Sequence, residues 1–222
     1  MIRKVTGHHV HALTWPLLTR ADGKKFGKSA GGSVWLSAER TSPYQLHQYF
    51  VQVPDADVRR MLLWFTLLPV ETWHVVADAH QADPTARTGQ RRLAHEVTAL
   101  VHGEVAAVSA EAAAAVLFGA DLDSLADEVF RSLEREVATT ELDAARLVAG
   151  IDPVELFAET GVAGSRSDAR RSLDHGALYV NNRRLAPDAP PIGAGDLRAG
   201  RYVLLRKGKR TYHLVRMATP GA

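Results

Sequence analysis

Apolar residues recur at helical spacing through the middle of the chain, between about residues 55 and 150. The run Asp55-Ala56-Asp57 precedes the first apolar stripe and suits a helix start, and Thr85 after Pro84 is predicted to cap a second helix. Because this pattern continues across short polar turns, we predict a helical bundle or array over residues 51–150. The predicted helices cover 58–65, 90–102, 109–117, 122–133 and 142–149, and the apolar face of 90–102 consists of Leu93, Val97, Leu100 and Val101.

The pattern changes near Ile151-Asp152-Pro153, where short helices alternate with strand-like runs. Gly176 follows the second of these helices and suits the left-handed position that ends a helix. Asn181-Asn182 is typical of a tight turn between two strands. We therefore predict an α+β module over residues 151–222. Its expected elements are helices at 154–160 and 167–175, a strand at 177–180, a loop at 187–195 and a hairpin formed by 201–206 and 211–216.

Residues 1–50 lack a long periodic stretch and mix Gly, Ser, Thr and Pro with short apolar runs. We predict a strand or two here, then a loop rich in lysine, then a short helix near Pro43–Val51. The predicted fold is therefore mainly α-helical with a C-terminal α+β module. Its expected divisions are 1–50, 51–150 and 151–222.

Composition narrows the class of protein. The chain of 222 residues contains no cysteine, which excludes disulfides and thiolate metal sites. No apolar run approaches the roughly 18 residues that span a bilayer, and the N-terminus has no apolar signal-peptide segment. We therefore expect a soluble cytoplasmic protein with no membrane partner.

Charge is unevenly distributed along the chain. Residues 151–222 hold 12 Lys and Arg against 7 Asp and Glu, whereas residues 1–150 hold 15 against 18. A basic C-terminal third suggests a surface that faces nucleic acid, although a solvated charged face is the commoner origin of any one basic cluster. The side chains expected to contact RNA phosphates are Arg166, Arg170, Arg171, Arg183, Arg184, Lys207, Lys209 and Arg210.

Two other groups of side chains are not expected to bind a ligand. The aromatic residues Trp64, Phe65, Tyr202 and Tyr212 are expected in the core, so neither basic cluster is predicted to offer an aromatic platform for bases. The pair His9 and His11 could share one face of a strand, but no carboxylate lies near them in the sequence. We therefore predict no metal site.

The segment Asp22-Gly23-Lys24-Lys25-Phe26-Gly27-Lys28-Ser29 places three lysines beside two glycines. Glycine lets the backbone approach an anion closely and the ammonium groups neutralise it, so the segment suits a flexible phosphate-binding loop. A solvated turn is the alternative on these residues alone. The spacing differs from that of a G-x-x-x-x-G-K-[ST] phosphate loop, because the first glycine is missing.

The wider context of this segment resembles a known family. The run LTWPLLTRADGKKFGKSAGGSVWL, followed by TSPYQLHQYF, is similar to the second signature region of bacterial tyrosyl-tRNA synthetases, and Lys25-Phe26-Gly27-Lys28-Ser29 stands where that family has its KMSKS-type loop. The runs DADVRRMLLWFTLL and RRLAHEVTALVHGE resemble its helical domain. The runs SRSDARRSLDHGALYVNNRRL and GRYVLLRKGKRTYHLV resemble its S4-type RNA-binding domain. The resemblance covers nearly the whole chain, in the family's own order.

The resemblance implies a fold and a reaction. The fold would be the edge of a Rossmann-like catalytic domain, then a helical domain, then an S4-like domain. The family joins tyrosine to tRNA through a tyrosyl-adenylate, with ATP, accompanied by Mg, as a substrate. The resemblance also implies roles for residues of the loop. Lys25 and Lys28 would stabilise the departing pyrophosphate, Lys28 and Gly27 would contact ATP, and Ser29 would add a hydroxyl donor.

The implied active site is incomplete in these residues. No H-x-G-[HN] motif occurs, and the tyrosine pocket and most of the family's dimer interface are expected to precede Met1. Three interpretations stay open: the C-terminal part of a tyrosine–tRNA ligase, a non-catalytic tRNA-binding protein derived from one, and one half of a split enzyme. The near-family form of the lysine loop favours the first. ATP and tyrosine would then be partners only where a catalytic half is supplied, whereas tRNA is a partner in each case.

Overall fold

The structure is a computed structural model, and it describes residues 2–14, 17–19, 23 and 34–218. The predicted catalytic and ATP-contacting residues Lys25, Gly27, Lys28 and Ser29 lie outside the described residues. The chain divides into two units, Met1–Val34 and Trp35–Ala222, and each is described by itself.

The first unit contains one helix among its described residues, α1 (Ile2–Thr6). None of those residues belongs to an assigned strand, so the predicted strand or two is not found there. A strand needs hydrogen-bonding neighbours and an apolar face to bury. Most of the described apolar side chains of this unit are exposed to solvent instead, Leu13 to 92%.

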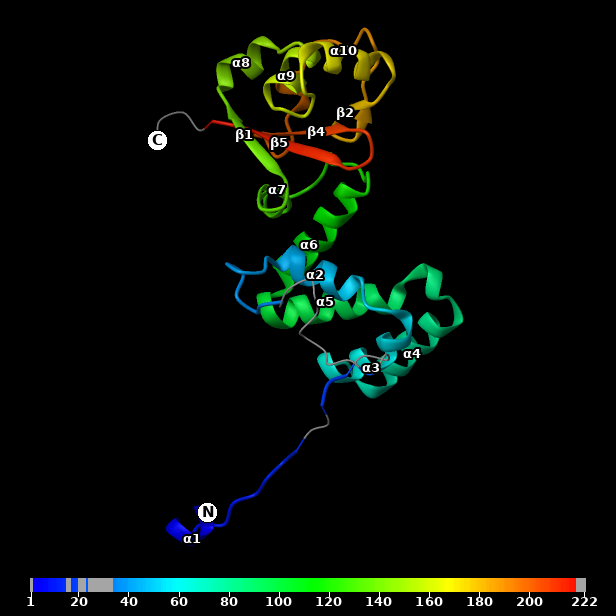
Figure 1. Cartoon of the computed structure of the whole chain (residues 1–222), viewed down its shortest axis with the longest axis vertical. Helices are drawn as coiled ribbons and strands as arrows, with labels where there is room; N and C mark the ends of the chain where they lie inside the picture. Colours follow the sequence, from blue (N-terminus) through cyan, green and yellow to red (C-terminus); the bar gives the residue numbers. More distant parts are fainter. Residues whose placement is uncertain (1, 15–16, 20–22, 24–33, 219–222) are drawn as a thin grey trace. The chain divides into compact units, whose positions relative to one another are not determined.

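The second unit begins with helices (Figure 1). The predicted helix α2 (Pro43–Val51) is confirmed, and a capping box starts it. Ser42 Oγ accepts a hydrogen bond from Gln45 N (3.1 Å), and the Gln45 side chain accepts one from Ser42 N (3.3 Å). The helices that follow are α3 (Asp55–Phe65), α4 (Val70–Ala82), α5 (Thr88–His102) and α6 (Glu104–Leu117), with the 3₁₀ turn η1 (Pro84–Ala86) before α5.

Helix α5 is central to this helical part, because it packs against α2, α3, α4 and α6. Gly89 marks a close crossing: a Cβ added there would lie 2.6 Å from Val58 Cγ1 and 2.9 Å from His80 Cβ. Leu93 and Val97 are buried as predicted. Leu100 is not, since the last turn of α5 is uncovered on its side and leaves this side chain 60% exposed.

The predicted cap at Thr85 is wrong. Thr85 lies inside η1, where Asp83 Oδ1 accepts hydrogen bonds from the backbone N–H groups of Thr85 (3.1 Å) and Ala86 (3.3 Å). Asp83 caps this turn because it stands directly before Pro84, which suits the first helical position. The residue before α5 is Arg87, in a left-handed conformation (φ 54°).

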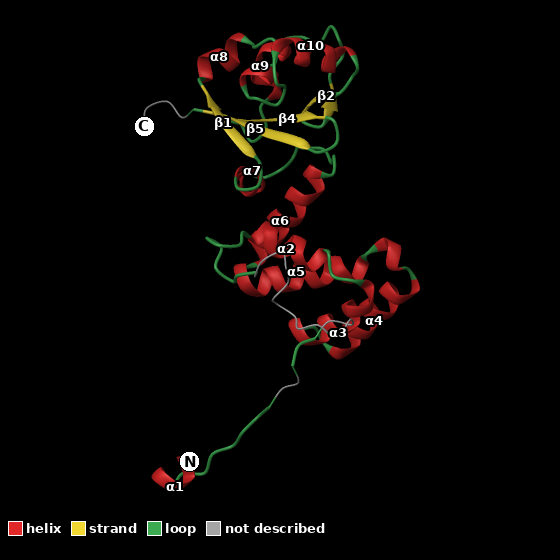
Figure 2. Cartoon of the chain, viewed as in Figure 1, coloured by secondary structure: helices red, strands yellow, loops and turns green. Residues whose placement is uncertain are grey.

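The rest of the unit is a five-stranded sheet with helices on both faces (Figure 2). The strand order is β1-β5-β4-β2-β3, with β1 parallel to β5 and the other pairs antiparallel. Val203 and Leu205 face one core, and Tyr202 and Leu204 face the other. The elements are α7 (Asp127–Glu134), β1 (Ala138–Leu142), α8 (Ala144–Ala149), α9 (Pro153–Glu159), α10 (Arg166–Asp174), β2 (Leu178–Val180), β3 (Arg183–Arg184), η2 (Ala194–Asp196), β4 (Tyr202–Lys207) and β5 (Thr211–Met217).

Most local signals of this part are confirmed. Helices α9 and α10 lie within a residue or two of their predicted bounds, and Gly176 (φ 63°) follows α10 as expected. Asn181 (φ 49°) and Asn182 (φ 62°) form the tight turn between β2 and β3.

Strand β1 is the main correction. The helices predicted over 122–133 and 142–149 start later, at Asp127 and Ala144, and β1 lies between them. Its pattern gave no strand signal because it is an edge strand, mostly exposed, whose pairing partner β5 is far along the sequence. Since β1 belongs to the sheet, we propose Asp127, rather than residue 151, as the start of the C-terminal module.

Candidate nucleic-acid interface

Three of the predicted RNA-binding residues share the exposed side of α10. Ser165 caps the helix by accepting a hydrogen bond from Asp168 N (3.1 Å), and Arg166 and Arg170 follow one helical turn apart. With Arg171 they line a groove of about 550 Å³ beside the start of α9. Among the described residues, none of the three has a carboxylate within ion-pair distance. These guanidinium groups are therefore available to an anion.

Two acidic residues, Asp152 and Glu155, line this groove with the arginines, and Asp152 Oδ1 accepts a hydrogen bond from Glu155 N (3.1 Å) as the cap of α9. Arg146 donates to both carboxylate oxygens of Glu159 (2.8 Å each) and lies 3.6 Å from Glu155. The hydrogen bonds from Arg146 hold the pKa of the Glu159 carboxyl below its usual value. Three arginines therefore share the groove lining with two carboxylates, which leaves a net positive charge there.

Two other predicted contacts, Lys207 and Arg183, are paired with carboxylates. Lys207 Nζ pairs with Asp168 Oδ2 (2.6 Å), which also accepts from Gly164 N (2.9 Å), and these bonds lower the pKa of the Asp168 carboxyl. Arg183 pairs with Asp123 and with Asp121 (3.4 Å) in the loop after α6. Lys207 therefore ties β4 to α10, and Arg183 ties β3 to the loop before α7.

A row of alternating arginine and tyrosine crosses the sheet. Arg184, Tyr179, Arg206 and Tyr212 are register neighbours on β3, β2, β4 and β5. The guanidinium carbon of Arg206 lies 3.7 Å from the centre of the Tyr179 ring, and that of Arg184 lies 5.7 Å from it. A hydrogen bond from Arg184 to the Tyr179 hydroxyl (3.2 Å) lowers the pKa of Tyr179. Arg206 was missed in the sequence, and the signal that could have found it is its strand register with two tyrosines.

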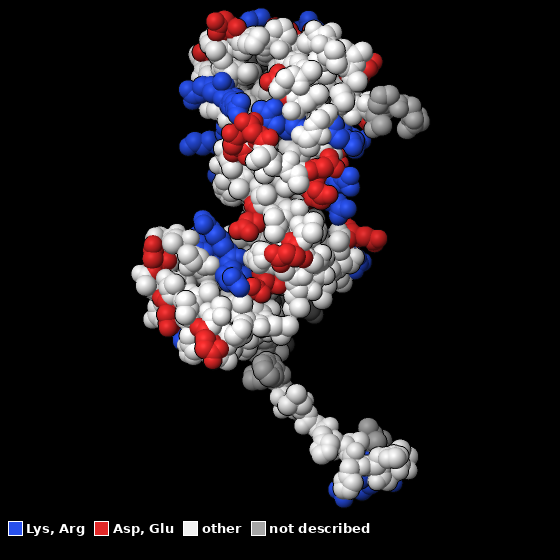
Figure 3. All heavy atoms as spheres, turned by 180° about the vertical axis from the view of Figure 1, so that it is seen from behind, with Lys and Arg blue, Asp and Glu red and all other residues white. Residues whose placement is uncertain are grey.

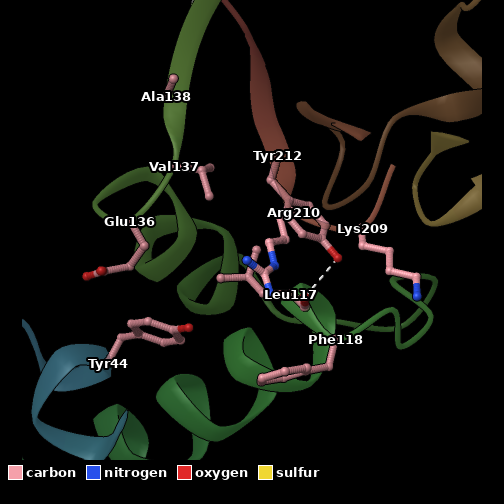
Figure 4. Close-up of a pocket in the computed structure, with 9 residues that line it drawn as sticks. All are labelled: Tyr44, Leu117, Phe118, Glu136, Val137, Ala138, Lys209, Arg210 and Tyr212. Atoms are coloured by element: carbon pink, nitrogen blue, oxygen red, sulfur yellow. Dashed lines mark hydrogen bonds between the residues drawn. The ribbon is translucent and has the colours of Figure 1, made fainter. Parts of the chain in front are cut away.

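The cations of the β4–β5 turn, Lys209 and Arg210, are exposed and line a pocket of about 610 Å³ (Figure 4). Figure 4 shows the half-buried Tyr212 beside Arg210, and Phe118 just past the end of α6 among the lining residues. No aromatic platform for bases was predicted at either basic cluster, whereas here Phe118 and Tyr212 line the same pocket as Lys209 and Arg210. The remaining lining residues are Tyr44, Leu117, Glu136, Val137 and Ala138.

Because β1 belongs to the sheet, the charges of the C-terminal module are counted from Asp127 rather than from residue 151. Residues 127–150 add 3 Arg and 6 Asp and Glu, so a module that starts at Asp127 holds 15 basic against 13 acidic residues. Many of these charges neutralise each other, as Arg216 does with Glu134 (3.1 Å) and Glu141 (3.2 Å). Basic side chains gather over the module with acidic groups beside them (Figure 3). The positive character is therefore local, at α10, the β4–β5 turn and the arginine–tyrosine row.

Two further sequence predictions concern absences. Among the described residues, no group of three His, Cys, Asp or Glu side chains is arranged to hold a metal ion. The described helices are also too short or too polar to cross a membrane.

Comparison with known proteins gives two family matches in order along the chain. Residues 1–119 match the family described as "tRNA synthetases class I (W and Y)", and residues 130–215 match the "Tyrosine--tRNA ligase SYY-like C-terminal domain". A tyrosine–tRNA ligase of Opitutus terrae is 43% identical over 98% of this chain and 51% of that protein. A tyrosine–tRNA ligase of Kineococcus radiotolerans is 44% identical over 99% of this chain and 51% of that protein. One of Nocardia farcinica is 47% identical over 94% of this chain and 49% of that protein. The chain thus spans about half the length of these curated relatives.

Proposed function

The chain belongs to the class I tRNA synthetase family of the tryptophan and tyrosine enzymes, and from that premise we propose that it serves the ligation of tyrosine to tRNA. The observation that carries the proposal is the order of the two family matches, class I synthetase at 1–119 and tyrosine–tRNA ligase C-terminal domain at 130–215. In the proposed reaction the tyrosine carboxylate attacks the α-phosphate of ATP, and pyrophosphate leaves. The tyrosyl group then passes from the adenylate to the tRNA.

The proposed part of the lysine loop in this reaction is electrostatic. Negative charge grows on the pyrophosphate as it departs, so a cation placed there stabilises the transition state more than the bound substrates. Lys25 and Lys28 are proposed to supply that charge, with Lys28 as the main ATP contact. Gly27 allows close approach of the backbone, and Ser29 adds a hydroxyl donor.

The C-terminal module is proposed to hold the tRNA, mainly through its phosphates. This part of the proposal is supported by five exposed cations that have no carboxylate within ion-pair distance among the described residues: Arg166, Arg170, Arg171, Lys209 and Arg210. Arg184 is exposed at the edge of the sheet and is kept in the proposed set. Arg183 and Lys207 are now proposed as framework residues, because carboxylates hold them.

Replacing Arg170 and Arg171 together by alanine is expected to weaken tRNA binding and to reduce its salt dependence. Each phosphate contact releases counterions, so the slope of log affinity against log salt should fall by about one to two units. Filter binding of the chain to tRNA at several salt concentrations measures this slope. The fold should be kept, because both side chains are exposed.

Arg91 and Arg92, adjacent and exposed on α5, provide a control of equal formal charge in which Arg92 is held by Glu96 (2.8 Å). Their double alanine variant removes the same charge from the helical part and should leave the slope nearly unchanged. An equal loss of slope in both variants would show that only total charge matters. A wild-type chain that binds no tRNA even at low salt would contradict the proposed role of the module.

A further inference from the structure

The pocket shown in Figure 4 contains an exposed aromatic ring on a residue whose backbone is held by hydrogen bonds. Phe118 is 85% exposed, yet its backbone N–H donates to the carbonyls of Ala114 and Ala115 (3.1 Å each) as the last cap of α6. Tyr212 forms a second wall, and its hydroxyl donates to the carbonyl of Leu117 (2.8 Å). The pocket thus presents an aromatic ring to solvent from a well-anchored position.

The cations of the pocket are not neutralised within the described structure. Lys209 and Arg210 have no described carboxylate within ion-pair distance, and Glu136 is the one acidic residue of the lining. Glu136 accepts hydrogen bonds from Ser42 Oγ and from Gln45 Nε2 (3.2 Å), so it is engaged with the start of α2. An anion that enters the pocket therefore meets two available positive charges.

The arginine–tyrosine row begins at this pocket, since Tyr212 belongs to both. The Arg206 guanidinium lies 5.8 Å from the centre of the Tyr212 ring and donates to the carbonyl of Gly208 (3.1 Å) in the turn. The row continues through Tyr179 to the exposed Arg184. A polyanion with one group in the pocket would therefore find further positive charge along the sheet, which a free nucleotide could not use.

We propose that this pocket holds one unpaired nucleotide of the bound RNA, with its base stacked on Phe118 and its phosphate on Lys209 and Arg210. The inference rests on the proposed RNA binding and names a site within it. A volume of about 610 Å³ is within the usual range for small organic groups. An unpaired base has a free face for an aromatic side chain, whereas a paired base is covered by its neighbours in the helix.

The test compares two short RNA hairpins, one fully paired and one with a single bulged 2-aminopurine, on the whole chain. Phe118→Ala should weaken binding of the bulged hairpin by about 5- to 150-fold, the loss expected for one base–aromatic stack. Binding of the paired hairpin and the salt slope should not change. The fluorescence of 2-aminopurine should be quenched by the wild-type chain and by Phe118→Tyr, but not by Phe118→Ala.

Each result decides between the possible occupants. The proposal for this pocket would be overturned if Phe118→Ala bound the bulged hairpin as tightly as the wild-type chain does, or if its binding of both hairpins were weakened equally. Either result would leave the proposed RNA binding intact. Displacement of the bulged hairpin by adenosine monophosphate at a similar concentration would assign the pocket to a free nucleotide instead. If the wild-type chain bound neither hairpin nor tRNA at low salt, the proposed function would fail together with the pocket.

Discussion

Replacing Lys28 by alanine is expected to slow the formation of tyrosyl-adenylate by about 10- to 1,000-fold in an enzyme assembled from this chain and the half of a relative that the chain does not span. The range corresponds to the loss of one charge-stabilising contact of about 1.4–4 kcal/mol. The effect should fall on the rate, because the pyrophosphate gains charge only as it departs. Tyrosine-dependent exchange of pyrophosphate into ATP measures it, and the affinity for tyrosine should barely change.

Lys24 offers a matched control for this variant. It lies in the same lysine-rich segment but outside Lys25-Phe26-Gly27-Lys28-Ser29, so Lys24→Ala removes an equal charge from beside the motif. Its activation rate should stay close to that of the unmodified assembly. The 222-residue chain alone, which contains no H-x-G-[HN] motif, serves as the blank and should give no tyrosine-dependent exchange. An unaltered rate in Lys28→Ala would identify the loop as a surface turn.

Truncating Phe130 to alanine is expected to destabilise the C-terminal module by about 3–5 kcal/mol. Phe130 on α7 is fully buried, and its ring stacks on Tyr202 of β4 with centroids 4.9 Å apart and planes 6° apart. Removing the ring leaves a cavity between α7 and the sheet. Urea unfolding followed by circular dichroism, together with hydrogen exchange of the β4 and β5 amides, measures the loss.

The tryptophans allow the two parts of the chain to be monitored separately. All four precede residue 74, so their fluorescence reports on the N-terminal and helical residues and not on the module. Phe130→Ala should move the module's transition to lower urea and shift the tryptophan transition less. Phe118→Ala is the control, because an exposed phenylalanine should change stability by no more than about 0.5 kcal/mol. Equal shifts in the two variants would contradict the role assigned to the stacked pair.

Elements with local signals could be predicted from the sequence. Helix α2 has its proline and its capping box within four adjacent residues, and the turn at Asn181-Asn182 needs only residues that tolerate positive φ. Strand β1 could not be predicted, because its stabilising contacts come from β5 at the other end of the module. The spacing of apolar residues describes one segment at a time and says nothing about such a partner.

The same limit applies to the candidate interface. The eight basic residues are visible in the sequence, but which of them stays available depends on carboxylates brought near by the fold. Asp168 reaches Lys207, and Asp121 and Asp123 reach Arg183, across long stretches of chain. Phe118 entered no prediction, because a single exposed phenylalanine after a helix has no distinguishing pattern. The interpretation of the lysine loop came from the family resemblance, since on its residues alone a solvated turn is the commoner explanation.

The sheet of the C-terminal module is completed by β5, which comes last in sequence order among its five strands. Strand β5 lies between β1 and β4, so Ala138 on β1 and His213 on β5 become neighbours only after β5 has left the ribosome. The helices α2, α5 and α6 make their mutual contacts from residues that emerge earlier. Non-local pairing of this kind forms late and slowly, and domains tend to fold as units during translation. A ribosome stalled before β5 emerges would therefore carry folded helices joined to an unformed sheet.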